Sequence, residues 1–288
     1  MKRLTISLLS TIALVGSAFA EIPIVNHYGP TGSTGVTAKS LSDNLNQKGY
    51  KTDPKFLTNC LLYKQTWDNA EKAIAIRSTT FNAGLIEACD IPTTKDNFVM
   101  LVNLTPLYMC NAGNGKTIED FRKPGASWKV GDSNALPKVI NDKLEQANNN
   151  KLTIVPYDGL NAVATSAKAG ELDFIWAISN WPESQLGAKC FFVLGTTDVQ
   201  GMQKAIDIWP NISELKTSFG FWVIAKGFKG EEFAKLKKDV RNAWETDAAW
   251  IEIRKKRNFV DSYIDKLTDQ QSLEMINRDR EIWGKPKQ

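Results

Sequence analysis

The sequence predicts an exported α/β protein in which strands and helices alternate along the chain. Three observations lead to this prediction. The chain begins with an apolar leader, short apolar runs then alternate with helical patterns, and a glycine-rich turn follows the first apolar run. Such alternation is typical of parallel sheets that are covered by helices on both faces.

The first 20 residues have the three parts of a secretory signal peptide. Lys2 and Arg3 give a positive start, Leu4–Val15 is mostly apolar, and Ala18-Phe19-Ala20 forms an A-x-A site before Glu21. The apolar run is too short to cross a bilayer and remain as an anchor. We therefore expect cleavage after Ala20, which leaves 268 of the 288 residues in the mature chain.

The charge of the chain gives no reason to expect a nucleic-acid partner. The formal net charge is +4 and falls to +2 when Lys2 and Arg3 are removed with the leader. The basic runs at 235–238 and 254–257 have acidic and apolar neighbours. Such runs are typical of solvated helix faces.

Apolar runs and helical patterns give the expected order of elements. In the first half we expect strands at 22–25, 50–57, 73–76, 98–102 and 107–110, and helices at 36–48, 67–73, 81–89 and 117–121. Thr117 precedes Asp120 by three residues, which predicts a capping box. In the second half we expect strands at 127–130, 152–155, 172–178, 190–194 and 219–225, and helices at 136–146 and 161–169, with two or three more between 231 and 283.

The glycine-rich turn runs from Tyr28 to Gly35, between the first expected strand and helix. A strand, a glycine-rich turn and a helix together aim backbone N–H groups at an anion. The glycines allow the backbone to approach a ligand closely, and Ser33 and Thr34 can cap the helix or donate hydroxyl hydrogen bonds. The same pattern also fits an ordinary connection between a strand and a helix.

Several stretches together carry a resemblance to a known family. They are Val155-Pro156-Tyr157-Asp158-Gly159, Ala169–Phe174 after the next helix, Thr31–Lys39 and Pro124–Gly131. On these residues the chain resembles the periplasmic solute-binding receptors of tripartite tricarboxylate transporters, the TctC or Bug-type proteins. It departs from their pattern at Gly35, where an Asp is usual, and at Thr31, where a Gly is usual.

The resemblance implies a type II periplasmic-binding-protein fold, with two α/β lobes and a ligand cleft between them. Lobe one would comprise 21–103 and 218–288, and lobe two 104–217. The implied function is a monomeric periplasmic receptor without cofactor or metal. It would capture a small organic anion, a carboxylate by expectation, and deliver it to the membrane permease subunits of a secondary transporter.

We expect the ligand to bind at the ends of strands, where loops precede helices. For each segment, local capping or packing is the competing interpretation. The expected ligand-binding residues are Tyr28, Thr31, Gly32, Ser33 and Thr34 in the first loop, Ser78, Thr79 and Thr80 after the third strand, Gly131, Asp132, Ser133 and Asn134 in a facing loop, and the aromatic residues Tyr157 and Trp181.

The mature chain has four cysteines, Cys60, Cys89, Cys110 and Cys190. An even number in an exported protein indicates disulfides, and three pairings are possible. We favour Cys60 with Cys89 and Cys110 with Cys190, because each pair then stays within one expected lobe. No Cys-x-x-Cys motif is present, which argues against thiol exchange and zinc.

Two other functions compete with a transport receptor. A ligand sensor that contacts a signalling kinase would have the same binding site, and the sequence does not separate it from a transport protein. A secreted hydrolase is disfavoured, because the chain has no G-x-S-x-G motif and His27 is its only histidine. We therefore expect a protein that is not an enzyme.

Overall fold

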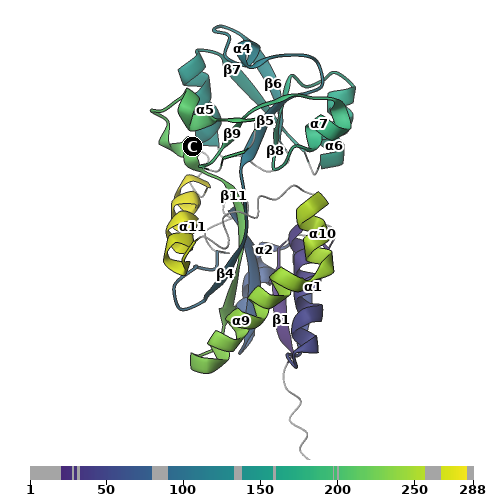
Figure 1. Ribbon diagram of the computed structural model, residues 1–288, viewed down its shortest axis with the longest axis vertical. Helices are drawn as coiled ribbons and strands as arrows, with labels where there is room; N and C mark the ends of the chain where they lie inside the picture. Colours follow the sequence, from purple (N-terminus) through teal and green to yellow (C-terminus); the bar gives the residue numbers. More distant parts are fainter. Residues whose placement is uncertain are drawn as a thin grey trace, which may run out of the picture.

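A computed structural model gives the fold and describes residues 21–27, 29–30, 33–79, 90–132, 138–157, 160–196, 198–199, 201–256 and 267–283. The strands form two separate sheets, which lie in the two halves of an elongated molecule (Figure 1). The signal peptide at 1–20 and the helix expected at 81–89 lie outside the described residues. Within them, no helix combines the length and the hydropathy that a membrane crossing requires.

The first sheet, here called sheet A, has five strands in the order β2-β1-β3-β11-β4. β1 is parallel to β2 and β3, whereas β11 is antiparallel to β3 and β4. The strands are β1 (Ile22–Asn26), β2 (Thr52–Phe56), β3 (Ala73–Ser78), β4 (Phe98–Thr105) and β11 (Phe219–Lys226).

Helices cover both faces of sheet A. On one face, Leu41 of α1 and Leu236 of α9 join Ile24 and Ile76 in a buried cluster. On the other face, residues of α2 and α11 pack against Trp222. The helices of this half are α1 (Ser33–Gln47), α2 (Cys60–Asn69), α9 (Gly230–Thr246), α10 (Ala248–Lys256) and α11 (Asp269–Trp283).

The second sheet, sheet B, has six strands in the order β10-β9-β5-β8-β6-β7. β5 is antiparallel to β8 and β9, and β6 is parallel to β7 and β8. The strands are β5 (Leu107–Asn111), β6 (Ser127–Asp132), β7 (Lys151–Pro156), β8 (Phe174–Ala177), β9 (Cys190–Leu194) and β10 (Gln203–Lys204).

Sheet B is also covered on both faces. Leu144 of α5 packs on one face, and Val163 of α6 and Trp181 of α7 pack on the other. The helices of this half are α4 (Ile118–Phe121), α5 (Lys138–Asn148), α6 (Leu160–Lys168), α7 (Trp181–Leu186), α8 (Ala205–Ile208) and the 3-10 helix η2 (Ser213–Lys216).

The chain crosses between the sheets at two places. Pro106 alone separates β4 from β5, and Thr217 and Ser218 separate η2 from β11. Figure 1 shows β11 entering the middle of the molecule from the half that holds sheet B. Thr217 and Ser218 are buried, so the second crossing is packed on all sides.

The α/β class is confirmed, and three local expectations are corrected. The sheets are mixed rather than purely parallel, because the crossing strands β5 and β11 run against their neighbours. The helix expected at 67–73 is wrong, since Asn59 caps α2 at Leu62 N–H (3.1 Å) and Ala70 is already extended. β6 continues through Gly131 and Asp132, which were expected in the loop after the strand.

Three cysteines, Cys60, Cys110 and Cys190, are bonded in disulfides. Cys110 and Cys190 are bonded to each other and sit opposite one another on β5 and β9, which confirms that pairing. Cys60 is also oxidised in a disulfide. Cys89 lies outside the described residues, so its pairing with Cys60 stays a prediction.

Candidate ligand-binding site

Strands of both sheets end at the junction between the two halves. β1 and β3 are parallel in sheet A, and β6 and β8 are parallel in sheet B. The carboxyl ends of each pair therefore lie at the same edge, here meaning the side of the sheet where parallel strands end. Gly220 N–H of β11 donates to Thr79 Oγ1 just after β3 (3.2 Å). Thr105 Oγ1 of β4 donates to Ile178 O just after β8 (3.1 Å). Because ligands of open α/β sheets bind outside the carboxyl ends of strands, this junction is the candidate site.

The first loop joins β1 to α1 at the sheet A side of the junction. Helix α1 begins at Ser33, three residues before the expected start, and Thr34 is buried. The first turn of α1 has no acidic side chain, so the positive end of its dipole has no opposing carboxylate within the turn. The other expected residues of this loop, Tyr28, Thr31 and Gly32, lie outside the described residues.

His27 stands between β1 and the first loop and is neutral at neutral pH. Its Nδ1 lies 3.2 Å from Leu57 O, and a carbonyl oxygen only accepts, so Nδ1 carries the proton. Burial, and to a smaller extent the charge of Arg77, hold the pKa of His27 below its ordinary 6.5. The ring therefore adds no charge to this edge of sheet A.

Arg77, near the end of β3, is the residue at this edge that sequence reasoning missed. Its side chain has no exposed surface and forms an ion pair with Asp90. The other carboxylate oxygen of Asp90 pairs with Arg280 of α11. Two cations thus share one carboxylate, which leaves one net positive charge in the triad. The only signal was an arginine directly after the apolar run Ala73–Ile76.

Two of the three expected hydroxyl residues after β3 are described. Ser78 and Thr79 are both buried, and Thr80 lies outside the described residues. Because Thr79 Oγ1 accepts from Gly220 N–H, its own hydroxyl hydrogen remains a donor. The end of β3 therefore brings buried hydroxyl groups to the junction.

On the sheet B side, Gly131 and Asp132 end β6 and are buried. A Cβ at Gly131 would lie 2.6 Å from Leu172 Cδ1 and 3.2 Å from Val163 Cγ1. The glycine thus permits close packing of α6 on the sheet, which is a structural role. Asp132 O accepts a hydrogen bond from Tyr157 N–H (2.9 Å). Ser133 and Asn134 lie outside the described residues.

The two expected aromatic residues lie on the same face of sheet B. Tyr157 is half-buried and packs against the cluster that contains Trp181 and residues of α6. In the described part of the chain, the indole N–H of Trp181 and the hydroxyl of buried Tyr108 have no hydrogen-bond partner. Each of these two groups is therefore a donor that a polar group could use. Tyr108 is a second residue that sequence reasoning missed.

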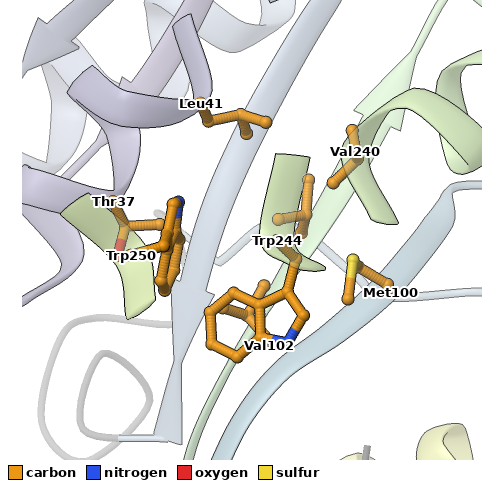
Figure 2. A pocket seen from close by; sticks show the side chains of 8 residues that line it. Thr37, Leu41, Met100, Val102, Val240, Trp244 and Trp250 are labelled. Atoms are coloured by element: carbon orange, nitrogen blue, oxygen red, sulfur yellow. The ribbon is translucent and has the colours of Figure 1, made fainter. Parts of the chain in front are cut away.

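A cavity in the half that holds sheet A is too small for a ligand. It has a volume of about 10 Å³ and lies between sheet A and helices α1, α9 and α10 (Figure 2). A volume of this order holds at most one water molecule. Thr37 is the only lining residue with a hydroxyl group. The lining residues are Thr37, Leu41, Met100, Val102, Val223, Val240, Trp244 and Trp250. Among the described residues, no group of three or more His, Cys, Asp or Glu could hold a metal ion.

Comparison with known proteins shows which solved structures share this fold. No family model matches the chain, and no curated protein matches it. Solved structures do match. A TctC solute-binding protein from Polaromonas is 16% identical, with a TM-score of 0.66 over 92% of this chain and 96% of that one. The chain has the fold of the periplasmic solute-binding proteins. MatC from Rhodopseudomonas palustris with bound malate is 12% identical, at a TM-score of 0.66 over 92% of this chain and 97% of that one. Another R. palustris protein, solved with adipate, is 13% identical, at a TM-score of 0.64 over the same shares.

Proposed function

We propose that the protein is an exported solute-binding receptor, a divergent member of the TctC or Bug-type family. It captures a small organic anion, most simply a carboxylate, between its two halves and delivers it to a membrane transporter. The observation that carries the proposal is the junction, where β3 and β8 end beside the two crossings of the chain, in the fold of solute-binding proteins. Structures of this fold with malate and adipate support the choice of a carboxylate.

The chemistry of the junction supports an anion. The first turn of α1 offers free N–H groups, and Ser78 and Thr79 add hydroxyl groups. Within the described residues, the triad of Arg77, Asp90 and Arg280 contributes one net positive charge. In this proposal, lobe one comprises 21–103 with 218–288, lobe two comprises 104–217, and the lobes close around the ligand.

The remaining expected ligand contacts are part of the proposal. Tyr28, Thr31, Gly32 and Ser33 would hold one end of the ligand at lobe one, and Gly131–Asn134 would hold it at lobe two. Tyr157 and Trp181 would contact the tail. The disulfide between Cys110 and Cys190 supports an oxidising compartment, which agrees with a signal peptide cleaved after Ala20.

A thermal-shift screen of the mature protein tests this function. The compounds are mono-, di- and tricarboxylates, with inorganic phosphate and sulfate as other anions. A ligand at 100 times its dissociation constant stabilises the folded state by about 2.7 kcal/mol, which raises Tm by about 5 °C or more in a protein of this size. If no carboxylate shifts Tm at millimolar concentration, the proposed function is refuted.

Two matched serine variants locate the site. Ser78→Ala removes a buried hydroxyl at the carboxyl end of β3. Ser42→Ala removes a buried hydroxyl that bonds to Thr52, at the opposite edge of sheet A (2.9 Å between the hydroxyl oxygens). Both are expected to lower Tm modestly, but only Ser78→Ala should weaken binding of a carboxylate found in the screen. Equal affinities in the two variants would remove the end of β3 from the site.

A further inference from the structure

The second crossing between the sheets is held from both halves of the molecule. From the half with sheet B, the N–H of Gly195, just after β9, donates to Leu215 O (2.8 Å). Gly195 has a φ of +107°, and a Cβ there would lie 2.6 Å from Ser218 Oγ, so only glycine lets the two segments come this close. From the half with sheet A, helix α11 holds the residues that follow Leu215.

Two neighbouring side chains of α11 hold three consecutive residues of the crossing. The carboxylate of Asp279 accepts from the N–H of Ser218 and from the hydroxyl of Thr217. Arg278 Nη2 donates to Lys216 O (3.4 Å), and the same guanidinium donates twice to Asp279 Oδ1. The crossing is therefore divided, with Leu215 fixed to one half and the next three residues fixed to the other.

The first crossing gives little freedom to compensate. It consists of Pro106, whose ring fixes φ, and Thr105 before it donates its hydroxyl to Ile178 O of the other half (3.1 Å). A rotation of one half against the other has to change backbone dihedral angles at both crossings. The hold of α11 on Lys216–Ser218 thus restricts that rotation.

Arg278 is the charged group in contact with the Asp279 carboxylate among the described residues. From the crossing, Thr217 and Ser218 offer uncharged donors, and Lys216 offers its backbone oxygen while its side chain is exposed. Asp279 itself is buried. The hold therefore depends on one buried carboxylate and one arginine.

The other described elements against α11 leave this pair alone. Arg280, the next residue of the helix, pairs with Asp90, which also pairs with Arg77 of β3. Where β4 and β11 pack with α11 in one cluster, their side chains are apolar, as in Leu101 and Trp222. These charges are thus engaged with each other and do not replace the contact between Arg278 and Asp279.

A proton on Asp279 would disturb this arrangement. An ionised carboxylate only accepts, and its two oxygens have roughly four acceptor sites. Four donors converge on Asp279, two from Arg278 and two from the crossing. The neutral acid carries a donor of its own, so at least one of these hydrogen bonds is lost, and the ion pair with Arg278 is lost with the charge.

We propose that Asp279 is a proton-sensitive latch on the second crossing. As a carboxylate it fixes the crossing to α11 and keeps the two halves in one relative orientation, and as the neutral acid it lets the crossing bend. This inference goes beyond the proposed function, because it concerns the movement of the halves in the absence of any ligand.

Distances between two spin labels test the latch on the mature protein. A ketone-bearing amino acid takes the label at Leu61 of α2 and at Lys123 after α4, which are exposed in different halves, and the native disulfides stay intact. Pulsed electron resonance at a series of pH values from 7.5 to 4.5 gives the distance distribution. Burial raises the pKa of Asp279 to about 6, so a narrow distribution at pH 7.5 should broaden as pH falls, with its midpoint near pH 6.

Two matched variants assign the change to Asp279. Asp279→Asn puts a neutral amide in place of the carboxylate, so its distribution should already be broad at pH 7.5, where circular dichroism checks that the protein is folded. Asp269→Asn removes a carboxylate from the same helix that forms a surface pair with Lys237, and it should keep the wild-type response. The inference is overturned if the wild-type distribution is the same at pH 7.5 and 4.5, if Asp279→Asn is as narrow as wild type at pH 7.5, or if Asp269→Asn abolishes the response.

Discussion

Substitution of Asp279 by Asn is expected to change how the stability of the protein depends on pH. Asp279 lies on α11 and is 1% exposed. Its carboxylate accepts hydrogen bonds from Arg278 Nε (3.1 Å) and Nη2 (2.9 Å), and from the backbone N–H of Ser218 and the hydroxyl of Thr217. The last two residues form the second crossing between the sheets. Burial outweighs these donors and raises the pKa of Asp279 from 3.8 to about 6.

The sign and size of the effect follow from this pKa. Between pH 3.8 and about 6 the folded protein binds a proton at Asp279 that the unfolded chain has already released. The free energy of unfolding therefore falls as pH rises through this window. At 1.36 kcal/mol per pKa unit, the loss amounts to about 3 kcal/mol. The amide that replaces the carboxyl group in Asp279→Asn cannot titrate, so the variant lacks this loss.

The assay is urea unfolding followed by tryptophan fluorescence, from pH 3.5 to 7.5, for wild type and Asp279→Asn. The difference between the two proteins removes the contribution of the other carboxylates. Relative to the variant, wild type should lose about 2–3 kcal/mol of unfolding free energy between pH 4 and pH 7. Asp269→Asn is the control on the same helix, because its half-exposed carboxylate forms a surface ion pair with Lys237, which contributes about 1 kcal/mol or less.

Two outcomes would refute this reasoning. A constant difference across pH would mean that Asp279 titrates alike in the folded and unfolded states. A difference that grows in favour of wild type with rising pH would mean that the four donors outweigh burial, with the pKa lowered rather than raised.

Two further predictions concern local structure. Replacing both Cys110 and Cys190 by Ala should lower the free energy of unfolding by about 2–4 kcal/mol, because the bond closes a loop across a sequence separation of 80; an unchanged urea midpoint would contradict this. Thr117→Ala should cost about 1 kcal/mol in the same assay, because Thr117 and Asp120 form a reciprocal capping box on α4, whereas Ser213→Ala, which removes an exposed hydroxyl that donates to the neighbouring Glu214 on η2, should cost less.

Local patterns in the sequence were enough to predict most of the helices and strands. The apolar run at Cys190–Leu194 is strand β9, and the capping box at Thr117 begins α4 as expected. The error at α2 has a local cause as well. Asn59 is an N-cap in the sequence, but the stretch after it lacks a clear apolar period, and Leu61 and Leu62 are exposed. The hydrophobic pattern therefore placed the helix too late.

The candidate site was predictable only in part, because its groups come from distant segments. Strand ends and glycine-rich turns are local patterns, and they led to Ser78 and Thr79. The charge balance of the junction could not be predicted from local patterns. It depends on Arg77, Asp90 and Arg280, and no sequence spacing indicates that these three side chains meet. Gly35 was visible as an unusual residue, but its reason, a collision of any Cβ at this position with the backbone of Gly29 and Pro30, required coordinates.

Helix α11 contacts two features of the junction that the sequence did not reveal. They are the packed second crossing and the carboxylate of Asp90, which pairs with two arginines. Asp279 and Arg278 hold the crossing at Lys216–Ser218, and Arg280 reaches Asp90 beside β3. Arg280 and Asp90 are 190 residues apart in the chain. Contacts of such long sequence separation carry a high cost in loop-closure entropy and form slowly. The charge balance of the candidate site and the packing of the second crossing are thus completed only when the last helix docks, although every strand end of the site lies earlier in the chain.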